Sequence, residues 1–138
     1  MINKRKLECA CGTGKSAETC CLRVIGGQLK AATPAQLMRS RYVAYVQANA
    51  DYLLQSWHVS TRPETITLEK GLLWTGLTLL SESKVIAGSA GKTGYVEFIA
   101  RFTHDGVAGQ MHERSRFLFE QGRWFYVDGE HGEKVISR

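Results

Sequence analysis

All four cysteines of this 138-residue chain lie in the stretch CACGTGKSAETCC, at positions 9, 11, 20 and 21. Thiols at this density can hold a metal, form disulfides or carry redox chemistry. Two of them are adjacent and the other two lie two residues apart, so only disulfides across the two pairs would avoid serious strain. Zinc accepts four thiolates at about 2.3 Å in a tetrahedron, which two short clusters joined by a loop can supply. The spacing therefore favours a closed four-thiolate metal site.

The loop between the two cysteine pairs contains the sequence GTGKS. We expect Gly12 and Gly14 to adopt positive φ, which would wrap the backbone around an ion. The Gly-Lys-Ser ending is shared with phosphate-binding loops, but Cys9 stands where that motif needs its first glycine, and no hydrophobic strand precedes it. We therefore predict no nucleotide site. Redox chemistry of free thiols is an alternative, although the Cys-x-x-Cys spacing of thioredoxin-like proteins is missing.

The pattern C-x-C-G-[hydroxyl]-G, with eight residues between the second and third cysteines and then Cys-Cys, resembles the SEC-C zinc motif. That motif is known from the C-terminal tail of the bacterial protein-export ATPase and from many small proteins. Ala10 stands where Pro is usual and Thr13 where Ser is usual, but neither is a ligand. Catalytic zinc usually keeps an open position, so a closed set favours a structural staple. The resemblance implies a zinc ion bound by Cys9, Cys11, Cys20 and Cys21.

The composition is that of one globular domain, with 43% hydrophobic and 22% charged residues. The basic N-terminus is not followed by the apolar stretch of a signal peptide, and apolar runs such as LLWTGLTLL are too short to span a bilayer. We predict a cytoplasmic protein, in which clustered thiols hold a metal more often than they form disulfides.

The formal net charge is +5 and the isoelectric point is near 9.2. Four thiolates and one zinc ion would reduce this charge to about +3. Basic residues alternate with acidic ones along most of the chain, as on an ordinary solvated surface. We therefore do not predict nucleic-acid binding.

Two helices are expected after the Gly26-Gly27 hinge. Thr33 can cap the first, with Pro34 at its first position and Gln36 completing a capping box. Apolar and aromatic residues recur at three- and four-residue steps, and Asn49 is expected to end the helix. The inward positions of this helix are Leu37, Met38, Arg41, Tyr42, Tyr45 and Val46. A second short helix is expected over residues 51–58.

The period then changes to two, which is typical of strands. Residues 73–81, 95–102, 115–120 and 123–128 are expected to form an antiparallel meander, with Val96, Phe98, Ala100 and Phe102 facing inward. Turn signals at His104-Asp105-Gly106 and Glu120-Gln121-Gly122 predict hairpins. The fold class is therefore α+β.

This order of elements resembles the nuclear transport factor 2-like fold, in which helices close one side of a strongly bent sheet to form a cone. The segments TPAQLMRSRYVAYVQANADYLLQSWHVSTRP, YVEFIARF and HERSRFLFEQGRWFYVDG resemble the YchJ-like family, which joins a SEC-C motif to such a cone. The family commonly carries a second cysteine motif after the sheet, whereas this sequence ends at GEHGEKVISR without one. The resemblance implies a zinc-binding segment over residues 1–28 and a nuclear transport factor 2-like domain over residues 29–138.

Enzymes with this fold place a carboxylate or histidine in an apolar cavity, where desolvation tunes its pKa. The available groups are Asp51, His58, Glu97, His112, Glu113 and Asp128, and no two form a catalytic pair by spacing. The alternation of Glu97 with Val96 and Phe98 favours a solvated or ion-paired position. Candidate ligand-binding residues are His58, Arg62 and Arg114, since arginine offers a planar fork of donors to an anion; each could instead serve local structure.

We therefore predict a non-enzymatic zinc protein that binds a protein partner, or a small ligand in the cone. By analogy with the export ATPase, the partner would belong to protein export or translation. The alternative is a lyase, isomerase or hydrolase that uses the cone as its pocket. The chain is expected to be a monomer or a homodimer, the latter through the open sheet face, where Tyr95 or Phe117 would lie.

Overall fold

The computed structural model of the chain describes residues 8–88, 91–131 and 135–136. The helical elements come first: a 3-10 helix η1 (Ala17–Thr19), then α1 (Cys21–Ile25), α2 (Pro34–Val46) and α3 (Ala50–Gln55). The strands follow: β1 (Leu72–Glu82), β2 (Ile86–Gly88), β3 (Gly91–His104), β4 (Val107–Glu120), β5 (Arg123–His131) and β6 (Val135–Ile136). The α+β class and the order of helices before strands are confirmed.

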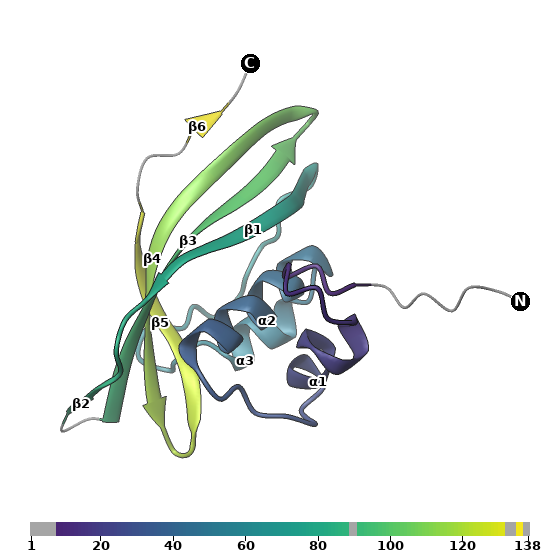
Figure 1. Cartoon of the computed structure of the whole chain (residues 1–138). Helices are drawn as coiled ribbons and strands as arrows, with labels where there is room; N and C mark the ends of the chain where they lie inside the picture. The colour runs from purple at the N-terminus through teal and green to yellow at the C-terminus, as the bar shows by residue number, and fades with distance from the viewer. Residues whose placement is uncertain (1–7, 89–90, 132–134, 137–138) are drawn as a thin grey trace, which may run out of the picture.

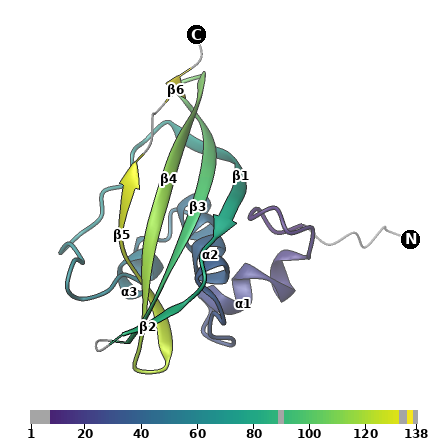
Figure 2. The ribbon, with the colours of Figure 1, turned by 60° about the vertical axis from the view of Figure 1, so that its left-hand side comes forward.

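The strands form an antiparallel sheet in the order β1-β3-β4-β5, with short strands β2 and β6 pairing with β3 and β4 respectively. The helices cover one face of this sheet and leave the other face open (Figures 1 and 2). We call the uncovered side the open face. Two-residue turns join β3 to β4 and β4 to β5, and all four turn residues have positive φ: Asp105, Gly106, Gln121 and Gly122. Both predicted hairpins are confirmed, with geometry typical of a type I′ turn.

The sheet is not strongly curled, so the strong bend expected from the sequence is not found. Register shifts, which bend a strand locally, occur where β1 pairs with β3 and once where β4 pairs with β5. The central pair β3 and β4 keeps one register from Lys92 to His104. The central strand pair therefore has no β-bulge that would bend the sheet sharply.

Alternate residues of β3 point toward the helices as predicted. Val96, Phe98, Ala100 and Phe102 are all buried. On β4 the inward residues include Phe117, which is fully buried, so the expectation that Phe117 lies on the open face is wrong. Phe117 lies on the same strand face as Ser115 and Phe119, whereas the residues that alternate with them point to the open face.

The first helix begins as predicted, because the Thr33 side chain accepts a hydrogen bond from the Gln36 backbone N–H at 3.1 Å. It ends earlier than predicted, at Val46, which is exposed rather than inward. Ala48 takes a positive φ, and the Asn49 side chain caps α3 by accepting from the Tyr52 N–H. Asn49 thus begins the second helix, which is shorter than the predicted range of 51–58.

The N-terminal elements lie on the helical side of the sheet and pack against α2 (Figure 1). Buried Cys9, Cys11 and Cys21 belong to the same apolar cluster as Leu37 and Met38 of α2 and buried residues of the sheet. The division at residue 28 remains a prediction. Among the described residues, no helix has the length and apolar character to cross a bilayer.

Candidate metal centre and ligand cavity

The four cysteine side chains converge, with all their sulfur atoms within 4.8 Å of one another. The Sγ atoms of Cys11 and Cys20 are 3.6 Å apart, and those of Cys20 and Cys21 are 3.8 Å apart. A tetrahedral zinc site with bonds of about 2.3 Å places its sulfurs about 3.8 Å apart. These separations are also too long for a disulfide, and all four cysteines are free. The residues therefore fit a four-thiolate metal site.

The loop carrying the cysteines, residues 9–21, is called the cysteine loop below. Gly12 and Gly14 both adopt positive φ, as predicted. The Thr13 hydroxyl lies beside two sulfurs, 3.5 Å from Cys11 Sγ and 3.3 Å from Cys20 Sγ. Because a hydroxyl can donate to a thiolate, Thr13 can serve as a second layer of contacts around a metal.

The thiols share protons unequally in the absence of a metal. The hydrogen bond from the Cys21 thiol lowers the pKa of Cys11 to about 4. That same hydrogen bond and burial raise the pKa of Cys21, and burial raises the pKa of Cys9. At neutral pH the cluster thus holds an ionised Cys11 and protons on Cys9 and Cys21, which a metal must displace.

A second feature on the helical side of the sheet is a cavity of about 290 Å³ between α2, Trp57 in the segment after α3, and the inner sheet face. We call it the cone cavity. Its volume is near the lower end of the range for small-molecule sites, roughly 300–1,000 Å³. Its aromatic wall consists of Tyr42, Tyr45, Trp57, Trp74, Phe98 and Tyr126.

Arg41 brings a buried positive charge to the cone cavity, with 4% of its surface exposed. Its Nη1 donates to the Leu53 carbonyl oxygen at 2.7 Å and to Ser56 Oγ at 2.6 Å. The guanidinium carbon lies 4.4 Å from the centre of the Tyr126 ring, a cation–π contact. Burial lowers the pKa of Arg41, but an arginine remains protonated at physiological pH.

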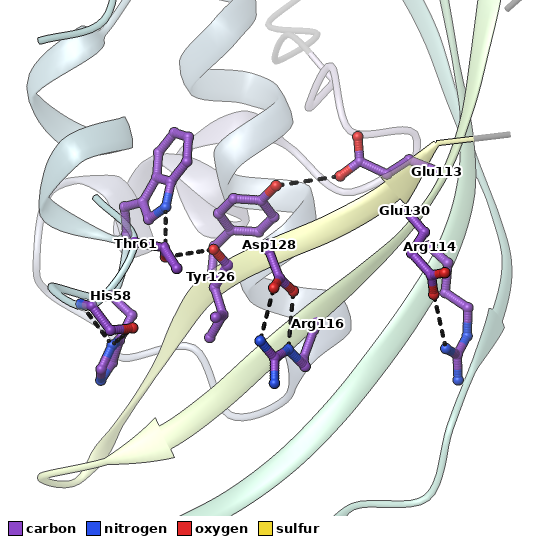
Figure 3. A network of polar contacts seen from close by, with 11 residues as sticks. His58, Thr61, Glu113, Arg114, Arg116, Tyr126, Asp128 and Glu130 are labelled. Atoms are coloured by element: carbon purple, nitrogen blue, oxygen red, sulfur yellow. Dashed lines mark hydrogen bonds and ion pairs between the residues drawn. The ribbon is translucent and has the colours of Figure 1, made fainter. Parts of the chain in front are cut away.

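Glu113 brings a carboxylate to the same cavity and is also buried. Its Oε2 accepts from Ser115 Oγ at 2.6 Å and from the Tyr126 hydroxyl at 3.5 Å, a contact seen in Figure 3. Burial and the nearby Glu113 charge raise the pKa of Tyr126, so its hydroxyl keeps its proton at neutral pH. The cone cavity therefore combines one cation, one carboxylate and neutral hydroxyl groups.

The three predicted ligand-binding residues lie apart, and none lines the cone cavity. The His58 ring bonds to Ser60 through Nδ1 and to Glu120 through Nε2, at 2.7 and 2.8 Å. Arg62 is exposed in a shallow hollow beside α3. Arg114 is on the open face, 3.9 Å from Glu130 (Figure 3). Its guanidinium carbon lies 4.0 Å from the centre of the Tyr95 ring. Ligand binding by these three residues remains a prediction.

The other candidate acids and bases lie on the open face of the sheet, except Asp51, which belongs to α3. Glu97 contacts His112 Nε2 on the open face, outside the cone cavity, which agrees with the expected solvated or ion-paired position. Asp128 forms a two-point ion pair with Arg116, with N–O distances of 2.7 and 2.9 Å (Figure 3). Asp51 is exposed in the hollow beside α3, next to Arg62. Of the predicted acids and bases, only Glu113 lines the cone cavity.

Sequence reasoning missed Arg41 as a functional candidate, although it placed Arg41 at an inward position of the first helix. A charged residue within an apolar helical stripe must be neutralised or must face a cavity. The position of Arg41 among inward apolar residues could therefore have indicated a functional role. The signal for Glu113 was its period-two relation to Ser115 and Phe117 on one strand face.

The fold and the cysteine cluster together define a class of protein: a nuclear transport factor 2-like α+β domain preceded by a four-cysteine motif. The family described as "YchJ, middle NTF2-like domain" matches residues 33–129. A UPF0225 protein of Streptomyces coelicolor is 47% identical over 123 residues, which cover 88% of this chain and 94% of that protein. A UPF0225 protein of an Enterobacter species is 40% identical over 126 residues, covering 88% of this chain and 81% of that protein. The chain belongs to this YchJ-like UPF0225 family.

Two solved structures share the architecture. A SEC-C motif containing protein from Rhodopseudomonas palustris is 32% identical, with a TM-score of 0.78, and the match covers 92% of this chain and all of that one. A SEC-C motif containing protein from Psychrobacter arcticus, 22% identical, matches with a TM-score of 0.71 over 96% of this chain and 85% of its own, and supports the fold alone.

Proposed function

We propose that this chain is a non-enzymatic binding protein, in which a zinc ion on the four cysteines holds the cysteine loop against the cone. The observation that carries the proposal is the convergence of the four sulfur atoms in a partly buried cluster. Four thiolates fill the coordination shell of zinc, so the ion would have no open position for substrate. Its contribution is to stability, because a closed site converts metal-binding free energy into folding free energy.

The cysteine loop is also a surface for a partner. Its connecting residues Gly12 to Lys15 are exposed, while three of the metal ligands are buried beneath them. A metal that fixes these exposed residues lowers the entropy lost when a protein partner binds. The SEC-C resemblance supports a partner from protein export or translation.

The test is the zinc content per chain of gently purified protein, measured beside a count of reactive thiols. We expect one zinc ion and no free thiols in the wild type, and loss of the metal in Cys20→Ser. Thr19→Ala, which changes a neighbouring exposed residue, is the matched control and should keep its zinc. Metal-free wild-type protein with four titratable thiols would overturn the proposal and favour the redox alternative.

Partner capture tests the second half of the proposal. Wild-type protein and Thr19→Ala should recover the same partners from a bacterial lysate, and Cys20→Ser should lose them. Recovery of identical partners by Cys20→Ser would show that the zinc-ordered loop is not the binding surface.

An enzyme is the second candidate function, favoured by one observation: Glu113 is a buried carboxylate that faces an aromatic cavity. Against it, the described residues that line the cone cavity include one carboxylate and no histidine, so a second acid–base group must come from a tyrosine or the substrate. Incubation with a metabolite extract, followed by mass spectrometry, would favour an enzyme if wild type depletes a compound and Glu113→Gln does not.

A further inference from the structure

The cone cavity contains hydrogen-bond donors that the protein leaves available. Both hydrogen bonds that Arg41 makes use Nη1, and among the described residues none accepts a hydrogen bond from its Nε or Nη2. In the same part of the chain, no fully buried side-chain nitrogen or oxygen lacks a partner. The remaining nitrogens of Arg41 are therefore accessible from the cavity that this residue lines.

Several contacts restrain the Arg41 guanidinium. Its Nη1 donates to the Leu53 carbonyl oxygen in α3 and to Ser56 Oγ just after α3, and the Tyr126 ring packs against it. Donors that are already oriented and largely desolvated bind an acceptor with little further loss of entropy. Arg41 would thus present its free N–H groups to an oxygen of a bound molecule.

The charge of Glu113 in the same cavity restricts which oxygen can bind. A ligand carboxylate beside Arg41 would also meet the Glu113 carboxylate, and like charges in a desolvated site cost several-fold to many-fold in affinity. An uncharged carbonyl oxygen avoids this repulsion. An N–H on the same ligand group would be attracted to the carboxylate, because a carboxylate accepts several hydrogen bonds.

We propose that the cone cavity binds a small, planar, uncharged amide, with one aromatic or heteroaromatic ring and a carbonyl oxygen that accepts from Arg41. The six aromatic side chains of the wall supply ring faces and edges for a flat ligand. A volume of about 290 Å³ suits one ring with a short polar group. This inference names the ligand class of the binding function proposed above and rests on it.

The test uses zinc-loaded full-length protein and three probes of one shape: benzamide, benzoate and benzylamine, which is cationic at neutral pH. Binding is measured by titration of protein NMR chemical shifts at millimolar probe concentration. Benzamide should bind, and benzoate should bind roughly tenfold more weakly. Benzylamine should also be weaker, because its ammonium group offers no acceptor to Arg41. Absence of benzamide binding, or tighter binding of either charged probe, would overturn the proposal.

Two variants locate the site. Glu113→Gln removes the negative charge at nearly constant size, so benzoate should gain about tenfold relative to benzamide, whereas Glu97→Gln on the open face should leave the ratio unchanged. Ala100→Leu fills the cavity from β3 and should abolish binding of all probes. Benzamide binding that survives in a folded Ala100→Leu protein would place the site elsewhere and reject the proposal.

Zinc is measured in every sample so that the two proposals fail separately. If zinc-loaded protein does not bind benzamide, the proposed ligand class is rejected and the proposed structural zinc site is unaffected. Protein that never holds zinc rejects the staple, whatever the probes do.

Discussion

The guanidinium of Arg39 donates a hydrogen bond from Nη1 to the carbonyl oxygen of Cys11 at 2.8 Å. These residues are 28 positions apart, and the contact joins α2 to the backbone of the cysteine loop. Its partner is a main-chain oxygen, so it supports the shape of the cysteine loop directly.

Replacing Arg39 by Met should therefore destabilise the protein. Loss of one charge-assisted hydrogen bond at a half-buried position is expected to lower the free energy of unfolding by about 1 kcal/mol. Urea denaturation of the zinc-loaded protein measures it. Arg62→Met is the matched control, since Arg62 is exposed and remote from the cysteine loop, and equal losses in both variants would contradict the role of the Cys11 contact.

Zinc binding should release protons and become tighter as pH rises. The pKa values of Cys9 and Cys21 are raised, so both are protonated in metal-free protein at pH 7, and zinc must displace one proton from each. Cys11, with a pKa of about 4, is already ionised and releases none. Because protons compete with the metal, affinity should fall as pH falls. Calorimetry in buffers of different ionisation enthalpy counts the protons, and a pH-independent affinity would contradict this assignment.

Metal removal should lower the melting temperature of the wild-type protein. Anything that binds only the folded state stabilises it according to its concentration and affinity. A strong chelator should shift the thermal transition of wild type downward and leave that of Cys20→Ser where it is. An equal shift in both proteins would indicate that the chelator acts on something other than the four cysteines.

Gly106 should resist substitution for a conformational reason. Its φ is +85°, in the hairpin between β3 and β4, and a Cβ there would meet no atom within 4 Å. Gly106→Ala should thus cost about 1 kcal/mol through backbone strain alone. Gly76→Ala in β1 adds a methyl at ordinary contact distance without a positive φ, so the denaturation midpoint of this control should change less.

Phe117 and Tyr95 provide a test of the two sheet faces. Phe117→Ala removes a fully buried ring and should cost roughly 3–5 kcal/mol. Tyr95→Ala removes a partly exposed ring that contacts Arg114 on the open face, and should cost about 1 kcal/mol or less. Comparable losses by chemical denaturation would contradict the assignment of these residues to opposite faces.

The predicted parts of the fold were those with short-range signals. Thr33 and Pro34 mark a helix start by local chemistry, and Asp105-Gly106 marks a hairpin by its φ preference. The strand face of Phe117 was predicted wrongly because Phe117, Leu118 and Phe119 are all apolar. In such a run, the alternation of side chains does not show which residues face inward. The inward partner is set by the register with β3 and β5, which depends on contacts distant in sequence.

The candidate sites divided in the same way. The convergence of the four cysteines was predictable because their spacing within one loop determines the geometry they can reach. The cone cavity brings Arg41 of α2 beside Glu113 of β4, 72 residues further along the chain. No local pattern links these residues, so their proximity became visible only with the packing of the helix on the sheet.

The apolar cluster that Cys9, Cys11 and Cys21 share with α2 has a consequence for how the chain can be cut. A protease that removed residues up to 28 would release the cysteines and also uncover Leu37 and Met38, which are buried in the intact protein. Newly wetted apolar side chains promote self-association. The shortened protein should therefore precipitate at concentrations where the intact chain remains in solution, even if its sheet keeps every hydrogen bond.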